Sequence, residues 1–371
     1  MSKFIAKTTP NKTRLAPEEL TAFGKELDQL GADVRASLGE ADAKHLRSAL
    51  NTSRMAAATG RGLLMFGFDP FTWVIGVLAL AKAKILENME VGHNVLHGQY
   101  DWMNDPQFNS QTYDWDIVCH PKNWRQTHNV EHHSHTNVLG KDDDYGYGLL
   151  RLAPEQRWGK IHLLQPIWWA LLMLLFQWGV AIQDIKLGRY FKGKMSRAEL
   201  AERAKPFLQK SSRQLFKDYL LFPALAFFNW PRVLLGNLAA NLIRNVWTNV
   251  IIFCGHFTEH AQVYSKEEVE NECKGAWYLR QMQGSSNLLG SRYFYLMTGH
   301  LSHQIEHHLF PDLPAPRYIE LAPKVRAICE KYGVHYNAAG FWRQYLSVMK
   351  RVFVYAIPNR KARVEATLIA Q

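Results

Sequence analysis

Four apolar runs alternate with charged segments along this chain, and they dominate its pattern of hydrophobic and polar positions. A helix needs about 20 mainly apolar residues to cross a bilayer, and only some of the runs reach that length. Tryptophans stand at several run ends, for example Trp168, Trp169 and Trp230, as is typical of a lipid–water interface. The runs cover residues 62–86, 163–182, 219–230 and 233–255.

The polar residues between the runs indicate a topology. Asp69-Pro70 interrupts the first run, which is therefore either one kinked span or two spans joined by a tight turn. Residues 186–217 hold ten Lys or Arg and two acids, so we expect them in the cytoplasm, with the second run in the interface or re-entrant. The last two runs would form a hairpin around Asn229-Trp230-Pro231. We therefore expect an all-α integral membrane protein with about four transmembrane spans and a cytosolic helical cap.

The chain ends are expected to lie outside the membrane. Ala16-Pro17-Glu18-Glu19 predicts a helix start, with proline in the first position and acids in the first turn. The N-terminus has no apolar core of the signal-peptide type, so secretion is not indicated. We divide the chain into a cytosolic N-terminal segment (1–55), a membrane domain (56–325) and a cytosolic C-terminal tail (326–371).

Composition adds two constraints. The chain of 371 residues is 47% hydrophobic, yet its mean hydropathy is only -0.25, because apolar and charged stretches are segregated. The net charge of +11 fits the cytoplasmic loops of a membrane protein, and no nucleic-acid reading motif accompanies it. The four cysteines are far apart, which argues against a disulfide framework or a thiolate metal site and fits a reducing compartment.

Most of the 16 histidines fall into four clusters, and each cluster contains two histidines four residues apart. Such a pair shares one helix face, and neutral imidazoles are good ligands for iron, zinc or copper. The pairs are His93/His97, His128/His132, His256/His260 and His303/His307, and the second and fourth pairs continue into His133 and His308. We expect each pair to be able to bind one metal.

The number of histidines predicts two metals. A single zinc site takes about four ligands, which leaves most of the clustered imidazoles unused. The expected hairpin topology also brings all four clusters to the cytoplasmic face. The histidines outside the clusters are expected to be surface residues or hydrogen-bonded core residues; they are His45, His120, His162 and His335.

Two other functions fit parts of the pattern. Three clusters match H-x-x-E-H, the inverted zinc-peptidase motif, but such an enzyme needs one copy, and three copies fit a shared cluster better. A membrane metal transporter would carry its histidines inside the spans, whereas these pairs lie at or beyond the span ends.

At these clusters the sequence resembles the membrane-bound fatty-acid desaturases, over roughly residues 60–325. The similar stretches are "ENMEVGHNVLHGQYDW", "HNVEHHSHTNVLGKDDDYGYG" and "QIEHHLFPDLP". The chain is most similar to bacterial acyl desaturases without a fused electron donor. The resemblance implies a helical stem, a cytosolic cap with two irons, and oxygen-dependent insertion of a double bond into the saturated chain of an acyl-CoA or acyl-lipid.

The resemblance also implies ligands. His93 and His97 match its first histidine box, His128, His132 and His133 its second, and His307 and His308 its third, while His256 matches an additional ligand. Many relatives have glutamine at the position of Gln304, whereas spacing alone favours His303, and both readings stay open. We expect His260, His300, Glu131 and Glu306 to be ligands or to orient ligands, together with Glu87, Glu259 and the acids of 142–144.

The chemistry needs an external electron source. Abstraction of hydrogen from an unactivated methylene requires a metal–oxygen oxidant, because side-chain acids and bases cannot perform it. The chain has no "HPGG" haem pattern, ferredoxin cysteine spacing or GxGxxG, so we predict a separate ferredoxin or flavin reductase. The basic residues of 186–217 could contact that partner, acyl-CoA phosphates or anionic lipid. A hydroxylase with the same di-iron site is the close alternative function.

Overall fold

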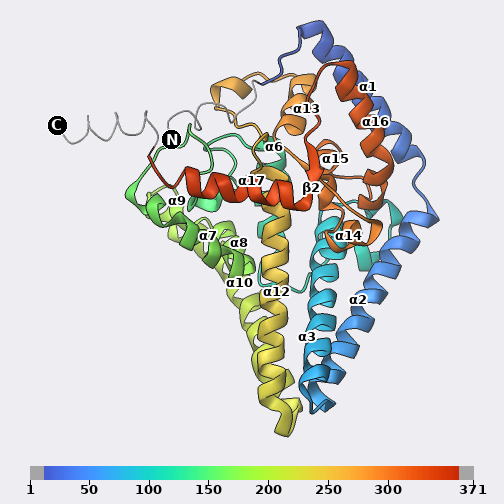
Figure 1. The fold of residues 1–371 in the computed structure, drawn as a ribbon, viewed down its shortest axis with the longest axis vertical. Coiled ribbons are helices and arrows are strands. Elements are labelled where there is room, and N and C mark those ends of the chain that lie inside the picture. The colour runs from blue at the N-terminus through green and yellow to red at the C-terminus, as the bar shows by residue number, and fades with distance from the viewer. Residues whose placement is uncertain (1–11, 359–371) are drawn as a thin grey trace, which may run out of the picture.

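The computed structural model describes residues 12–358, and its helices form a broad cap above a tapering stem (Figure 1). Three long helices build most of the stem, and the chain enters and leaves it from the cap. The main stem helices are α2 (Glu40–Phe66), α3 (Pro70–Ile85) and α12 (Trp230–His256), and the arm beside them contains α10 (Arg197–Phe216) and α11 (Phe222–Leu225).

The first apolar run folds as two helices joined by a tight turn, not as one kinked helix, while the number of membrane spans stays a prediction. Asp69 caps α3 by accepting a hydrogen bond from the backbone N–H of Thr72 at 2.9 Å. The two helices approach closely at Gly60, where a Cβ would lie 2.7 Å from the backbone nitrogen of Leu80. Glycine is therefore required at this crossing.

The second apolar run bends instead of continuing straight. The 3₁₀ segment η6 (Lys160–Leu164) leads into α7 (Gln165–Leu174), and α8 (Phe176–Asp184) departs at 95° from that pair. In residues 12–358, no single helix is long and apolar enough to cross a membrane, and only this bent pair passes when its arms are taken together. The expected four spans stay a prediction.

The last two runs form the expected hairpin. The π-helical segment η7 (Lys217–Leu221) and α11 lead to η8 (Phe227–Asn229), and α12 returns from Trp230 to the cap. Asn229 ties the turn to the first hairpin by donating a hydrogen bond to the carbonyl oxygen of Met65 at 2.8 Å. α12 therefore runs from the stem tip to the cap.

The cap is built mainly from short helices. Its core packs α1 (Pro17–Ala36), α13 (Lys274–Gln283) and α16 (Tyr318–Lys331) around buried side chains that include Phe23, Ile305 and Phe310. The remaining helices are α4 (Asn94–Leu96), α5 (Pro121–Trp124), α6 (His133–His135), α9 (Leu187–Phe191), α14 (Arg292–Met297), α15 (Gln304–Leu309) and α17 (Phe341–Val354).

The expectation of an all-α fold needs one small correction. β1 (Asn287–Leu289) and β2 (Ala338–Gly340) pair in parallel, and they join the chain just before α17 to the segment before α14. Three-residue strands are too short to give a strong alternating pattern, so the sequence did not indicate them.

The predicted boundaries between the three parts of the chain fall inside helices. α1 begins at Pro17, as predicted. Residues 55 and 56 both lie inside α2, and residues 325 and 326 both lie inside α16, so the proposed three-part division does not fall between helices. As a division into cytosolic and membrane segments it stays a prediction.

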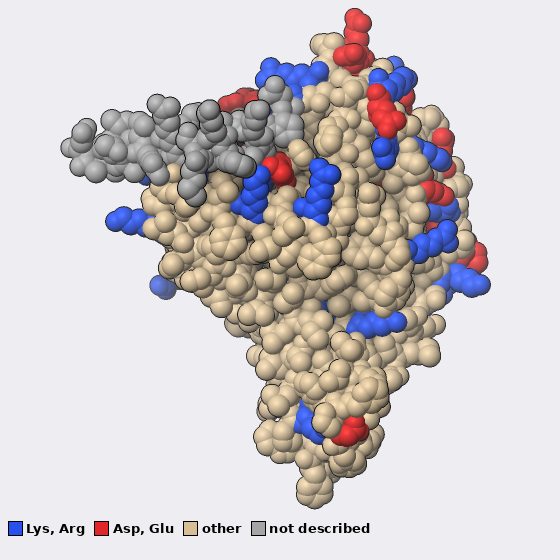
Figure 2. Space-filling view, viewed as in Figure 1, with Lys and Arg blue, Asp and Glu red and all other residues tan. Residues whose placement is uncertain are grey.

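Charged and apolar surfaces are separated. In the face shown in Figure 2, Lys, Arg, Asp and Glu gather on the cap, and the stem is largely free of them until its tip. The exposed apolar side chains of the stem include Phe68, Leu78, Phe228 and Leu235, of which Phe228 is 98% exposed.

Candidate di-metal site

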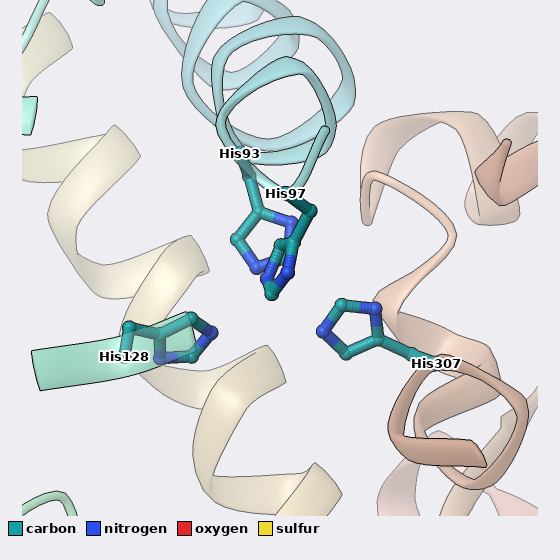
Figure 3. A group of neighbouring side chains, drawn as sticks. All are labelled: His93, His97, His128 and His307. Carbon is teal, nitrogen blue, oxygen red and sulfur yellow. The ribbon is translucent and has the colours of Figure 1, made fainter. Parts of the chain in front are cut away.

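Four histidines from three parts of the chain point toward one centre (Figure 3). His93 ends the π-helical segment η1 (Leu86–His93), and His97 follows α4 one turn later. His128 lies in a second π-helical segment, η4 (Arg125–His132), and His307 lies in α15. One ligand atom from each of these four side chains lies within 4.8 Å of those of the others. We call this set group 1.

A second set of three histidines lies beside group 1. His132, His256 and His308 are all buried, and their ligand atoms also lie within 4.8 Å of one another. Nε2 of His308 is 3.1 Å from Nε2 of His256. We call this set group 2.

His133 lies between the two groups. Its ring centre is 4.7 Å from that of His97 and 4.8 Å from that of His307 in group 1, and 4.3 Å from that of His308 in group 2. Both ring nitrogens of His133 are buried and have no hydrogen-bond partner among the described residues. The side chain is therefore placed to serve either group.

Hydrogen bonds fix the orientation of the rings through Nδ1. His132 donates from Nδ1 to both carboxylate oxygens of Asp142, at 3.0 and 3.1 Å, and His128 donates to Asp144 at 3.1 Å. His308 donates from Nδ1 to Oε1 of Gln281 at 3.0 Å. A proton held on Nδ1 leaves the lone pair on Nε2, which is the atom that faces the groups.

His93 and His307 are held in the same way by neutral partners. His93 donates from Nδ1 to Oδ1 of Asn94 at 3.1 Å, and His307 donates from Nδ1 to the hydroxyl of Tyr318 at 3.3 Å. The Tyr318 hydroxyl in turn donates to the carbonyl oxygen of Phe310 at 3.0 Å. These contacts therefore also leave the lone pair on Nε2, as the carboxylates of Asp142 and Asp144 do for His132 and His128.

The resulting site fits two metal ions. In group 1, Nε2 of His97, His128 and His307 is buried without a partner in the described residues, and in group 2 Nε2 of His256 lies 3.1 Å from Nε2 of His308. Burial, followed by the neighbouring imidazoles, holds the pKa of His133 and of His308 well below the ordinary histidine value, so both are neutral near pH 7. Convergent neutral imidazole nitrogens suit iron, copper or zinc.

His93 and His97 form an i, i+4 pair whose two rings both lie in group 1, and the prediction that each such pair binds one metal stays a prediction. His128 and His132 are divided between group 1 and group 2, although Nδ1 of both also lies near Asp144. Their helix segment is π-helical, with i→i+5 hydrogen bonds and a wider turn than an α-helix, and the two rings stack with their centres 5.0 Å apart.

The structure places Gln304, and not His303, beside group 2. The side-chain amide of Gln304 donates to Nε2 of His256 at 2.9 Å, and its Oε1 is buried without a partner in the described chain. The His303 ring instead packs against Tyr295, with ring centres 4.5 Å apart, and belongs to neither group. A left-handed backbone at His300 (φ 56°) precedes a short 3₁₀ turn, so the helix that carries His307 begins only at Gln304.

Two further candidate histidines lie outside both groups. The His260 ring packs against His335 at 5.4 Å between ring centres. His300 donates from Nδ1 to Glu90 at 2.8 Å, and the other oxygen of Glu90 accepts from His45 at 2.6 Å. His45, which is isolated in the sequence, thus joins a buried cluster with Glu90 and His300.

The candidate acids near the histidines have structural partners. Glu131 forms an ion pair with Lys186. Glu306 accepts hydrogen bonds from Asn287 at 2.7 Å and from the Tyr336 hydroxyl at 2.8 Å. Neither acid belongs to group 1 or group 2. Both therefore lie near the clustered histidines without joining either group.

A mostly apolar pocket reaches both metal groups. His93 and His128 of group 1 and His132 and His256 of group 2 line it. Its free volume is about 60 Å³. Apolar side chains form much of the remaining wall, among them Trp115, Ile117, Phe176, Val180 and Ile252.

Sequence reasoning missed several residues that hold or extend this site. Gln281 and Tyr318, which orient His308 and His307, carry no local motif, and Gln281 lies 19 residues before His300. Arg244 and Asn88 line the pocket from α12 and η1. The one available signal was Arg244, a charge within an otherwise apolar run.

Comparisons with known proteins agree with this arrangement. A family model described as fatty acid desaturase matches residues 70–340. A protein named NADPH-dependent stearoyl-CoA 9-desaturase, from Mycobacterium tuberculosis, is 42% identical over 356 residues, which cover 95% of this chain and 83% of that protein. An sn-1 linoleoyl-lipid 6-desaturase from Synechocystis sp. is 28% identical over 276 residues, covering 71% and 75% of the two chains.

Proposed function

The chain belongs to the fatty acid desaturase family, and we propose that it uses two iron ions and O2 to insert a double bond into a long-chain saturated acyl group. The acyl group would be carried as a CoA thioester or as a lipid ester, as the names of the relatives suggest. The observation that carries the proposal is the two adjoining imidazole groups beside an apolar pocket, with unpartnered Nε2 atoms in group 1.

We assign ligands from this geometry. His93, His97, His128 and His307 would hold one iron, with His133 beside them. His132, His256 and His308 would hold the other, and a half-turn of the Gln304 amide would add its Oε1. Bound iron would supply the activation of O2 and the oxidation of an unactivated C–H bond, which no side chain can provide.

The other residues of the site orient the histidine rings and enclose the pocket. Asp142 and Asp144 keep the proton on Nδ1 of His132 and His128, so that Nε2 of each ring stays free as a ligand. The Trp124 ring stacks on His128 at 4.5 Å between ring centres and shields it. The apolar wall excludes water and holds a saturated chain with its methylenes beside both groups.

Electrons would come from a separate protein. We propose a ferredoxin or a flavin reductase that docks on the cap, and the name of the 42% identical relative points to NADPH as their original source. The balance requires two electrons and two protons from outside for each O2 reduced to water while two hydrogens leave the acyl chain.

We further propose that the stem lies in a membrane, with the cap on the cytoplasmic face of a bacterial inner membrane. The exposed apolar side chains along the stem support this placement, because such a surface is stable in lipid and costly in water. The basic segment 186–217 would then lie at the cytoplasmic surface, in reach of anionic headgroups.

The test is iron content and product analysis with the purified protein in detergent, supplied with acyl-CoA or acyl-lipid, O2 and a reductant with ferredoxin. We expect two irons per chain and an unsaturated product. His133→Ala should lose iron and activity, whereas His135→Ala, whose Nδ1 only approaches the carbonyl oxygen of Glu131 at 3.2 Å, should keep both. An alcohol product would favour the hydroxylase alternative, and one zinc per chain without oxidation would refute the proposal.

A further inference from the structure

A buried arginine lines the pocket from inside the stem. Arg244 on α12 is only 1% exposed. Its Nε donates to Asn245 at 3.0 Å and its Nη2 to Asn241 at 3.4 Å, while Nη1 has no partner in the described chain. No carboxylate among residues 12–358 forms an ion pair with Arg244. A buried guanidinium with a free N–H strongly favours an oxygen acceptor, because an unpaired charged donor is costly in an apolar setting.

Arg244 lies on the same side of α12 as His256 of group 2. Arg244, Thr248, Ile252 and His256 follow one another at intervals of four residues, and all four line the pocket. Twelve helical residues separate the first from the last, which corresponds to about 18 Å along the axis. A substrate held at Arg244 would therefore present methylenes several carbons from the anchored end to the metal groups.

The surroundings of Arg244 suit the carbonyl end of an acyl group better than its methyl end. A methyl end offers no acceptor, whereas a thioester or ester carbonyl does. Nearby, Thr248 donates to Oδ1 of Asn88 at 3.4 Å, so this part of the pocket is polar.

A second cavity lies beyond the segment 115–117. Trp115 and Ile117 line the pocket, whereas Asp116 lines a more open cavity of about 260 Å³. The same cavity is lined by Arg54, Arg61 and Lys84, and Nη1 of Arg61 is buried without a partner in the described chain. The part of a polar headgroup next to an anchored carbonyl would have space there.

We propose that Arg244 binds the carbonyl oxygen of the acyl substrate and thereby determines which methylenes lie at the metal groups. This inference rests on the proposed function. The chemistry shared by its two possible substrates is a carbonyl oxygen, carried by an acyl thioester or by an acyl ester of a lipid.

The test measures binding without turnover. Anaerobic, iron-loaded protein in detergent is titrated with stearoyl-CoA and with the thioether analogue in which a methylene replaces the carbonyl. Wild-type protein should bind the thioester about 10- to 100-fold more tightly, the range for a hydrogen bond to a charged group. Arg244→Gln should bind the two probes within a few-fold of each other, and Arg326→Gln, an exposed control on α16, should discriminate as the wild type does. In the second arm, the same comparison is made with an acyl-ester lipid and its ether analogue, which lacks the carbonyl, both presented in vesicles.

The outcomes separate the inference from the proposed function. If Arg244→Gln keeps the wild-type preference for the carbonyl probe, the inference is overturned while acyl binding stands. If the wild type binds neither member of either pair, the proposed function fails with it. If Arg244→Gln does not fold, Arg244→Lys replaces it in the test, because lysine retains the charge with fewer hydrogen-bond donors. Arg244→Lys should keep part of the preference for the carbonyl probe. Product analysis of Arg244→Lys should show double bonds spread over neighbouring positions, and a single unchanged position would count against the inference.

Discussion

Both carboxylate oxygens of Asp142 accept a hydrogen bond from Nδ1 of His132, at 3.0 and 3.1 Å, and the pair is almost fully buried. Asp142 also accepts the backbone N–H of Asn137 at 2.8 Å and that of Asp144 at 3.0 Å. One carboxylate therefore fixes both a group 2 ring and the loop that follows the second histidine cluster.

We predict that Asp142→Asn weakens metal binding in group 2 by about 10- to 100-fold, the range for loss of a partner that orients a ligand. The amide keeps the shape of the side chain but removes the charge that favours the Nδ1 proton. Iron per chain, measured by mass spectrometry after dialysis against a graded chelator, reports the effect. Asp143→Asn is the matched control, because its half-exposed carboxylate contacts Lys186 and no histidine. Equal iron loss in both variants would refute the specific role of Asp142.

A second prediction concerns Gln304 and His303. Gln304→Leu should lower iron occupancy and activity, because it removes the amide beside His256 while filling the same space. His303→Gln should retain iron, because the His303 ring lies against Tyr295 and outside both groups. Iron analysis of the two variants side by side decides between the family pattern and simple spacing. Iron loss in His303→Gln alone would favour spacing.

A third prediction tests the membrane placement of the stem. Phe228 is 98% exposed at the turn before α12, so Phe228→Asp should disfavour insertion of the stem tip into lipid by a few kcal/mol. Flotation of the protein with lipid vesicles measures the effect as a reduced bound fraction. Thr21→Asp adds the same charge on exposed α1 in the cap and should float like the wild type. Unchanged flotation of Phe228→Asp would place the tip in water.

A fourth prediction concerns the metal-free protein at different pH. Burial lowers the pKa of His133 and of His308 in the folded state, whereas the unfolded residues titrate near about 6.5. The unfolded chain then binds more protons below that value, so the free energy of unfolding falls as the pH drops through it. Thermal unfolding of chelator-treated protein should show a midpoint that is constant above about pH 7.5 and falls below about pH 6.5. His133→Leu should flatten this dependence, and a midpoint that rises on acidification would contradict the assignment.

Much of the architecture could be predicted from the sequence, because it follows from local patterns. The break at Asp69-Pro70, the hairpin before α12 and the start of α1 depend on residues close together in the chain. His93, His97, His128, His132, His133, His256, His307 and His308 also come together as their clustering indicated.

What could not be predicted depends on irregular backbone and on contacts between distant residues. The left-handed residue His300 sets where α15 begins and thereby turns His303 away from the groups. Gln281 reaches His308 from α13, and nothing in its own neighbourhood in the sequence signals that contact. Arg244 faces the pocket because of its position on α12, which an apolar-run analysis records only as an interruption.

The π-helical turn at η4 (Arg125–His132) bears on how distant relatives should be recognised. A π turn holds one residue more than an α turn, so loss of that residue converts the turn to α-helix and leaves the flanking chain in place. A relative whose second cluster is one residue shorter could still direct imidazoles to the same two centres. Searches that demand a fixed number of residues between these histidines would discard such chains, whereas a pattern that tolerates one residue of length variation would retain them.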